Sequence, residues 1–227
     1  VSFVSVWPRS PVLRRAGIRA GCDAVYFGLG GWNMRAAATN FTLGQLPELR
    51  RICAKHGVRK YLTLNTIVYE HELRTLAQLL KRVEDFVDAV ICWDLSVIEL
   101  CRERGLPVHV STQASVSNSR AALFYKALGA ERIIPARDCT LEEIREIKSK
   151  ADIGVEVFIH GAMCVSVSGR CFLSQHLTGS SANRGKCLQP CRRLFKIGDT
   201  TSDQEFMLGE DTVLSAKDLC TLPFLEA

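Results

Sequence analysis

The sequence predicts an α/β fold built on a parallel sheet, most specifically a (βα)8 TIM-like barrel that is incomplete at its C-terminal end. Short apolar segments rich in β-branched and aromatic residues alternate with longer amphipathic segments, which is typical of buried parallel strands joined by helices. No hairpin turn separates successive strands, so they are expected to pair through right-handed crossovers. A doubly wound sheet satisfies the same pattern, but a repeat of roughly 20 to 35 residues favours the barrel.

The strands and helices are predicted in strict alternation. The six strands lie at 23–29, 60–66, 88–94, 107–112, 132–137 and 155–161. The five intervening helices lie at 42–57, 70–85, 95–105, 117–129 and 140–151. Each helix has apolar residues at helical spacing, and several begin at Thr or Ser and end at Gly.

The C-terminal third of the chain interrupts this alternation. Residues 162–210 form a segment rich in Gly, Ser, Asn, Arg and Cys, followed by a candidate seventh strand at 211–215. An irregular segment of this length is usually functional. A barrel needs eight strands, so we expect one barrel-type domain over residues 1–227, with a Cys-rich insertion after the sixth strand and the C-terminal part of the domain missing.

Composition limits the class of protein. The chain has 227 residues, 47% of them hydrophobic and 23% charged, which suffices for a substantial core. No apolar run approaches the roughly 18 residues of a membrane span, and no secretory signal is visible at the start. We therefore expect a cytoplasmic protein with no membrane insertion. In that reducing location the ten cysteines indicate ligands or redox chemistry rather than disulfides. The net charge of +5 permits an anionic partner.

Polar residues follow the predicted strands at the end where parallel barrels build their active sites. Together they would line one pocket suited to a small anion. The candidate catalytic residues are His160, Glu156, Arg137 and Asp94, and the candidate substrate-binding or cofactor-binding residues are Asn33, Arg35, Asn65, Gln113 and Arg137. Structural roles are the alternative: Asp94 could cap a helix, Glu156 could pair with a basic neighbour, and His160 could be a satisfied core group.

The clustered cysteines favour an iron-sulfur centre over zinc. Their spacing is Cys164-x6-Cys171-x15-Cys187-x3-Cys191, with Cys220 further on. Structural zinc sites normally use pairs of Cys-x2-Cys knuckles, whereas iron-sulfur clusters accept looser spacing and prefer thiolates. The remaining cysteines lie in or beside predicted strands and helices, where free Cys acts as a small apolar filler; they are Cys22, Cys53, Cys92, Cys101 and Cys139.

Several stretches resemble the peptidase U32 family. They are GCDAVYFGLGGWNMRAAATNFT, YLTLNT, VHVSTQASVSN, ERIIPARDCTLEEI and LSAKDLC, together with residues 155–193, which resemble that family's signature. The resemblance extends over nearly the whole chain from about residue 17. Two features depart from the family pattern. VSFVSVWPRSP replaces the usual first strand, and the family's KIEGR strand is absent after Cys220. The barrel is therefore expected to lack its first and last strands.

The resemblance implies a choice of functions. Members include collagenase-like peptidases and proteins that hydroxylate transfer-RNA uridine, a ribosomal-RNA cytidine or ubiquinone precursors without oxygen. Some carry a [4Fe-4S] cluster, and the ligand pattern of the ubiquinone-linked members corresponds to Cys164, Cys171, Cys187 and Cys220. A competing set with Cys191 in place of Cys220 stays open. RNA hydroxylation in the family is tied to prephenate, a dianion that would suit Arg35 and Arg137.

The residues favour hydroxylation over proteolysis. The sequence has no His-Glu-x-x-His helix and no Gly-x-Ser-x-Gly elbow, although Cys164 and His160 could form a nucleophile pair. An RNA hydroxylase acting on tRNA uridine or rRNA cytidine would meet phosphates through Arg184, Arg192, Arg193 and Lys196. The alternatives are a collagenase-like peptidase, an accessory protein of ubiquinone-precursor hydroxylation, and a cluster-bearing scaffold that works with a paralogous protein partner.

Overall fold

A computed structural model describes residues 17–36, 38–195, 214–221 and 223, together with the backbone of three two-residue strands at 5–6, 197–198 and 205–206. Its main feature is a parallel sheet in which the strands follow one another in chain order. The strands of this sheet are β1 (Ser5–Val6), β2 (Ala24–Gly28), β3 (Arg59–Leu64), β4 (Ala89–Cys92), β5 (Val108–Val110), β6 (Ala130–Ile133) and β7 (Gly154–Val155).

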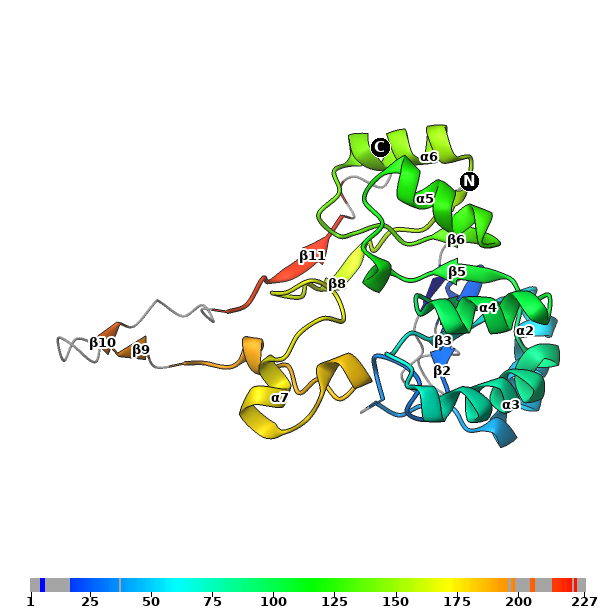
Figure 1. Cartoon of the computed structure of the whole chain (residues 1–227), viewed down its shortest axis with the longest axis horizontal. Helices are drawn as coiled ribbons and strands as arrows, with labels where there is room; N and C mark the ends of the chain where they lie inside the picture. Colours follow the sequence, from blue (N-terminus) through cyan, green and yellow to red (C-terminus); the bar gives the residue numbers. More distant parts are fainter. Residues whose placement is uncertain are drawn as a thin grey trace.

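Helices follow the strands and cover the outer face of the sheet (Figure 1). They are α2 (Leu46–His56), α3 (Leu73–Val83), α4 (Leu95–Glu103), α5 (Ser119–Ala127) and α6 (Leu141–Ala151). Single 3-10 turns precede or follow several of them, at η1 (Leu43–Gln45), η2 (Glu70–Glu72), η3 (Glu84–Phe86) and η4 (Thr112–Ala114). The predicted alternation of strand and helix is thus confirmed, and the strand order is that of a barrel. Within the described residues no hydrogen-bonded pairing joins β1 to β7.

Local sequence explains where the helices begin and end. Asn118 caps α5 by accepting from the backbone N–H of Ala121 at 2.9 Å, and Thr140 and Glu143 form a capping box at the start of α6. α2 ends at Gly57, which adopts the left-handed conformation with φ of 67°. These are the side chains and the glycine that satisfy exposed backbone groups at helix ends.

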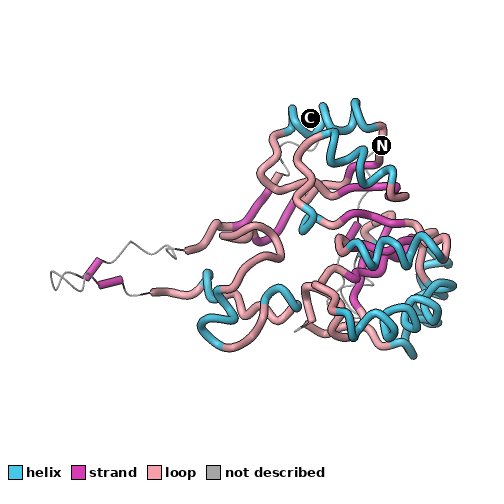
Figure 2. Tube along the Cα trace, viewed as in Figure 1, coloured by secondary structure: helices cyan, strands magenta, loops and turns pink. Residues whose placement is uncertain are grey.

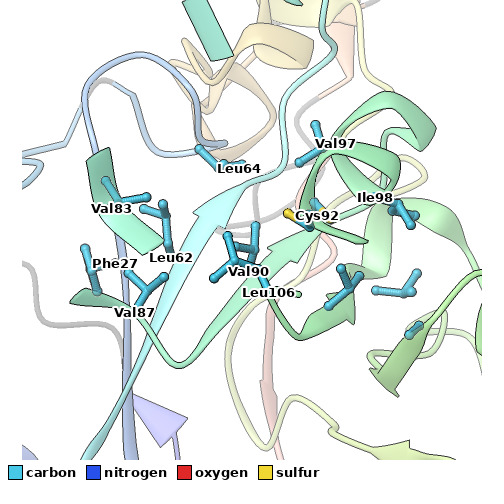
Figure 3. Close-up of a cluster of buried hydrophobic side chains, with 14 of the residues drawn as sticks. Phe27, Leu62, Leu64, Val83, Val87, Val90, Cys92, Val97, Ile98 and Leu106 are labelled. Carbon is cyan, nitrogen blue, oxygen red and sulfur yellow. The ribbon is translucent and has the colours of Figure 1, made fainter. Parts of the chain in front are cut away.

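The core lies between the sheet and the helices. Figure 3 shows Leu62, Leu64, Val90 and Cys92 of β3 and β4 pointing into one apolar cluster. Residues that alternate with these along the strands, such as Tyr61 and Ile91, belong to a second cluster on the inner face of the sheet. This division follows from the alternation of side chains along a strand, and it explains why both sets are apolar in a sheet that is covered on both faces.

Two expectations about the strands are wrong. The predicted strand at 155–161 is two elements: β7 ends the parallel sheet, and β8 (His160–Ala162) pairs antiparallel with β11 (Asp218–Cys220). The side chain of Val157, between them, is 42% exposed, so the chain has left the core there and pairs with a distant segment. The first strand is not missing either, because β1 pairs in parallel with β2, with Ser5 opposite Ala24.

The Cys-rich insertion is mostly loop (Figure 2). It contains the short helix α7 (Leu173–Thr178), the turns η5 (Ala182–Arg184) and η6 (Pro190–Arg192), and the strand pair β9 (Ile197–Gly198) and β10 (Glu205–Phe206). The ladder of β8 and β11 lies beside it (Figure 1). Most of the candidate strand at 211–215 falls outside the described residues. In the described part of the chain, no helix combines the length and apolar character needed to cross a membrane.

Candidate functional site

The Cys-rich insertion is attached to the sheet at the end where β3 leaves it. Asn183 of η5 accepts at its backbone oxygen from the N–H of Ile67, at 3.5 Å. The neighbouring Arg184 donates through Nη1 to the carbonyl of Ile67 and forms a two-pronged ion pair with Glu72 of η2. The guanidinium of Arg184 also lies over the Tyr69 ring, 4.8 Å from its centroid.

A second attachment involves the loops after β4 and β5. Arg170 donates to the backbone oxygen of Gln113 at 3.4 Å and lies over the Trp93 ring, 5.3 Å from its centroid. Trp93 in turn donates from its indole nitrogen to the carbonyl of Asn65 at 2.8 Å. The segment that contains Cys171 and Cys187 is therefore connected to the loops that follow three successive strands, β3, β4 and β5.

Four thiols of this insertion share one neighbourhood. Burial raises the pKa of the Cys191 thiol; the thiols of Cys187 and Cys164 raise it further, Arg192 lowers it, and Cys171 raises it slightly. All four cysteines are free, and Cys164 is exposed while the other three are half-buried. Three of the four predicted ligands, Cys164, Cys171 and Cys187, are thus near enough to Cys191 to influence it electrostatically.

The fourth predicted ligand, Cys220, lies on a different element. It is the last residue of β11, exposed, and opposite His160 of β8 in the antiparallel ladder. Cys220 is not among the groups that raise the pKa of Cys191. As the side chains stand, no three His, Cys, Asp or Glu residues of the described ranges lie close enough to share a metal ion. Cys191 and Cys220 both remain predicted candidates for the fourth ligand.

One of these thiols, Cys164, adjoins a cavity of about 250 Å³ at the ends of β5 and β6. Arg137 and Cys164 both line it. Arg137 donates through Nη1 to the carbonyl of Ala162 at 2.9 Å, and its guanidinium lies 4.3 Å from the ring centroid of Phe158. Its Nε is buried without a hydrogen-bond partner among the described residues. Hydroxyls and one carboxylate complete the polar lining, from Thr112, Ser115, Asp138, Ser166 and Ser168.

Two predicted catalytic carboxylates are engaged elsewhere. Asp94 caps α4, accepting from the backbone N–H and the hydroxyl of Ser96 at 3.0 and 2.7 Å, and it also accepts from the N–H of Val68 at 3.2 Å. Glu156 pairs with Arg132 at 2.9 Å on the inner face of the sheet. Neither lines the Arg137 cavity. Asp94 therefore has the helix-capping role, and Glu156 the ion-pairing role, that were the alternatives to catalysis.

The predicted binding amides form a buried polar layer beneath the insertion. Asn33 donates to Gly30 and Asn40 and accepts from the N–H of Arg35. Asn65 accepts from the N–H of Met34 at 3.0 Å, and Gln113 accepts from the hydroxyl of Ser111. All three amides are buried. Their role as substrate contacts stays a prediction.

The remaining predicted site residues are not brought into the cavity. Arg35 and His160 are exposed, and neither lines it. No hydrogen bond joins His160 to Cys164 in the part of the chain that the structure describes. The cavity therefore contains one of the two predicted guanidiniums. The buried cysteines behave as predicted: Cys22, Cys53, Cys92 and Cys101 lie in the core.

Sequence reasoning missed the residues that hold the insertion in place, above all Asn183, and it expected Arg184 to meet phosphate. The SANRG motif around them carries a usable signal, because Asn, Arg and Gly after a helix favour a tight turn with polar partners. It offered a basic neighbour as an alternative partner for Glu156 but did not identify that partner as Arg132. Their spacing, in consecutive predicted strands, could have indicated neighbouring inward-facing positions.

Comparison with known proteins adds a family context to this geometry. The family model described as peptidase family U32 matches residues 13–227. An uncharacterized protease of Methanocaldococcus jannaschii is 44% identical over 92% of this chain and 53% of its own length. A collagenase of Porphyromonas gingivalis is 37% identical over 92% and 54%. A tRNA hydroxylation protein of Bacillus subtilis is 39% identical over 89% and 50%.

The chain thus spans about half the length of these relatives. Among solved structures, a U32 peptidase superposes with a TM-score of 0.60 at 15% identity, covering 72% of this chain and 70% of that one. At that identity the likeness concerns the fold, which it supports as a parallel α/β arrangement.

Proposed function

This chain belongs to peptidase family U32, and from that premise we propose that it is an iron-sulfur protein acting in oxygen-independent hydroxylation of RNA with prephenate. The RNA would be tRNA, hydroxylated at uridine, or rRNA, hydroxylated at cytidine. One observation carries the proposal: Cys164 belongs to the group of four neighbouring thiols and also lines the cavity that contains Arg137. A redox centre and an anion site would then be adjacent.

The donor set suits a [4Fe-4S] cluster in its chemistry. The candidates are free thiols on an irregular loop, and Cys187 already accepts a hydrogen bond from the N–H of Gln189 at 3.4 Å; such bonds to ligand sulfur tune a cluster's potential. Cys164, Cys171 and Cys187 would hold the cluster together with Cys220 or Cys191. When bound, it would supply one-electron redox chemistry. Binding would have to draw the thiols together from their present positions.

Arg137 is the residue proposed to hold a carboxylate of prephenate. Its guanidinium is fixed by the carbonyl of Ala162 and by Phe158, so little side-chain entropy remains to be lost on binding. A planar guanidinium recognises a carboxylate through two parallel hydrogen bonds. The hydroxyls of Thr112, Ser115 and Ser166 would bind the other polar groups and orient the molecule beside Cys164.

RNA would approach the exposed side of the insertion. Of the four cations predicted to meet phosphates, Arg184 and Arg192 are engaged in ion pairs with Glu72 and Asp218. Arg193 is exposed, and no ion pair of the described residues includes it. Lys196 lies outside those residues. Arg193 is therefore the proposed phosphate contact, and its replacement should reduce the salt dependence of RNA binding.

The second candidate function is proteolysis, favoured by the relatives named as a protease and a collagenase. The exposed Cys164 and His160 would be its nucleophile and base. A role as an accessory protein in ubiquinone-precursor hydroxylation, or as a scaffold acting with a paralogous protein, remains a further alternative. Pulldown followed by mass spectrometry would identify such a partner.

The deciding experiment is anaerobic purification with iron and sulfide assays and an absorbance spectrum. We expect stoichiometric iron and sulfide in the wild type, and their loss in Cys164→Ser and Cys171→Ser. Cys191→Ser and Cys220→Ser identify the fourth ligand, and Cys139→Ser, a half-buried cysteine outside the insertion, is the matched control. A colourless protein with stoichiometric zinc would end the iron proposal.

Two activity assays separate the candidate functions. Hydroxylated uridine and cytidine are measured by nucleoside mass spectrometry in RNA from a host that lacks U32 proteins and expresses this chain. Gelatin digestion, with His160→Ala as control, tests proteolysis. Digestion that is lost in His160→Ala, without any change in RNA hydroxylation, would replace the first proposal by the second.

A further inference from the structure

We propose that Arg184 and Asn183 are positioning residues that fix the place of Cys171 on the end of the sheet, through the ion pair of Arg184 with Glu72. The inference rests on the proposed function only in treating Cys171 as a ligand. The contacts themselves connect η2, the loop after β3, η5 and the cysteine in one continuous path. The side-chain contacts of that path are directional and partly shielded from water.

The path begins at Glu72. Its carboxylate accepts from both terminal nitrogens of Arg184, at 2.9 and 2.5 Å, and from the backbone N–H of Tyr69 at 2.9 Å. The side chains of Arg184 and Glu72 are only 23% and 16% exposed. Burial alone would raise the pKa of Glu72, but the hydrogen bonds from Arg184 and Tyr69 outweigh it and lower that pKa. The carboxylate therefore stays charged and holds the guanidinium in one orientation.

The second step joins Arg184 to the backbone at Ile67. Arg184 donates to the carbonyl oxygen of Ile67, while the N–H of Ile67 donates to the carbonyl oxygen of Asn183. Consecutive residues of η5 thus contact the two polar groups of one peptide residue that follows β3. Ile67 lies in the loop that follows β3 (Arg59–Leu64), a central strand between β2 and β4, so the insertion is attached three residues beyond the end of the sheet.

The third step carries this position to the cysteine. Oδ1 of Asn183 accepts from the backbone N–H of Cys171 at 2.9 Å, and Asn183 is 7% exposed. The N–H of the half-buried Cys171 would lose its protein acceptor if this hydrogen bond broke, so breaking it costs free energy. The backbone of Cys171, and hence the origin of its side chain, is set by Asn183. The path from Glu72 to Cys171 involves no other insertion residue than Asn183 and Arg184.

The experiment measures cysteine reactivity in the metal-free, reduced protein, so it does not depend on cluster loading. Arg184→Lys keeps the positive charge but cannot make the two-pronged contact. We expect the alkylation rate of Cys171, followed by mass spectrometry, to rise about tenfold as the loop opens more often. The rate of Cys220, on β11, should not change. Arg145→Lys, in the exposed pair with Glu142, is the matched control and should leave both rates as in the wild type.

A second variant separates positioning from folding. Asn183→Ala removes only the side-chain acceptor of the Cys171 N–H and leaves the backbone contacts with Ile67 and the ion pair in place. Hydrogen exchange at the Cys171 amide should accelerate, with the amides of β3 unchanged. If Cys171 alkylates and exchanges at wild-type rates in both variants, the proposal is wrong. If the alkylation pattern is as expected but the wild-type protein contains no iron, the proposed cluster is wrong and the positioning role of Arg184 and Asn183 stands.

Discussion

Arg132 of β6 and Glu156, just after β7, form a 2.9 Å ion pair on the inner face of the sheet, with each side chain 17% exposed. The guanidinium of Arg132 also lies 5.9 Å from the centroid of the Tyr61 ring, and Tyr61 packs edge-to-face on His109 at 4.6 Å. Polar and aromatic side chains therefore pack together on the inside of the sheet. Glu156 therefore has a structural partner, and the effect of its replacement on the free energy of unfolding tests whether its role is structural or catalytic.

Replacing Glu156 should destabilise the fold. Glu156→Gln leaves the guanidinium of Arg132 shielded from water without its counter-charge, and we expect a loss of roughly 1 to 3 kcal/mol in the free energy of unfolding. Urea denaturation at neutral pH measures it. Glu142→Gln, in an exposed pair of α6, should cost less than about 1 kcal/mol. Unchanged stability together with lost activity would return Glu156 to a catalytic role.

His109 should make the protein acid-sensitive. Burial, with the charges of Arg132 and Arg59, lowers the pKa of His109 to about 3, whereas an unfolded histidine has a pKa of about 6.5. Between these values the unfolded chain binds a proton that the folded chain does not, so stability falls as the pH drops from about 6.5 towards 3.

The loss attributable to His109 is on the order of 4 kcal/mol near pH 3.5, at about 1.4 kcal/mol per pH unit. Urea midpoints at pH 7, 6, 5 and 4, compared between the wild type and His109→Gln, isolate this contribution because every other titrating group is shared. Parallel curves for the two proteins would contradict the prediction.

Asp94 should matter for stability more than an ordinary helix cap. Asp94→Ala removes the cap of α4 and also the acceptor of the Val68 N–H, so we expect a loss of about 2 kcal/mol, near the upper end for caps. Asn118→Ala removes the cap of α5 alone and should cost about 1 kcal/mol. Thermal or urea unfolding of the two variants gives the comparison, and equal losses would show that the contact with Val68 contributes nothing.

Gly185 should be essential for seating the insertion. A Cβ there would lie 2.1 Å from the backbone oxygen of Asn33 and 2.9 Å from Cβ of Ala36, with φ at +77°. Gly179 has a similar φ of +71° but no atom within 4 Å of its Cβ position. Gly185→Ala and Gly179→Ala therefore share the same backbone strain, of about 1 kcal/mol, and differ in available space.

Limited proteolysis distinguishes the two glycine variants. We expect cleavage within residues 163–195 to accelerate in Gly185→Ala and to change little in Gly179→Ala, because only the first substitution lifts the insertion from the loop after β2. Similar cleavage of both variants would show that backbone strain, rather than close approach, governs this segment.

The alternation of strands and helices, the parallel sheet and the cysteine-rich insertion could all be predicted from the amino-acid sequence alone. Local signals suffice for these, since the period of apolar residues and the helix caps act within a few residues. Segments such as 60–66 and 140–151 illustrate this, because β3 and α6 lie within one or two residues of their predicted bounds. The family resemblance further directed attention to Cys164, Cys171 and Cys187, each of which influences the pKa of Cys191; their role as ligands stays a prediction.

The contacts between polar residues, by contrast, depend on how distant segments pack in the folded chain. Asp94 follows β4, and Glu156, predicted inside its strand, lies just after β7. The first caps α4 and contacts Val68, while the second pairs with Arg132. His160 ends in a ladder with a segment about sixty residues away rather than in the Arg137 cavity. Such pairings depend on which distant groups arrive at hydrogen-bonding distance, and a buried polar atom takes whichever partner the packing supplies. That choice is a property of the folded chain and is not encoded in any local stretch.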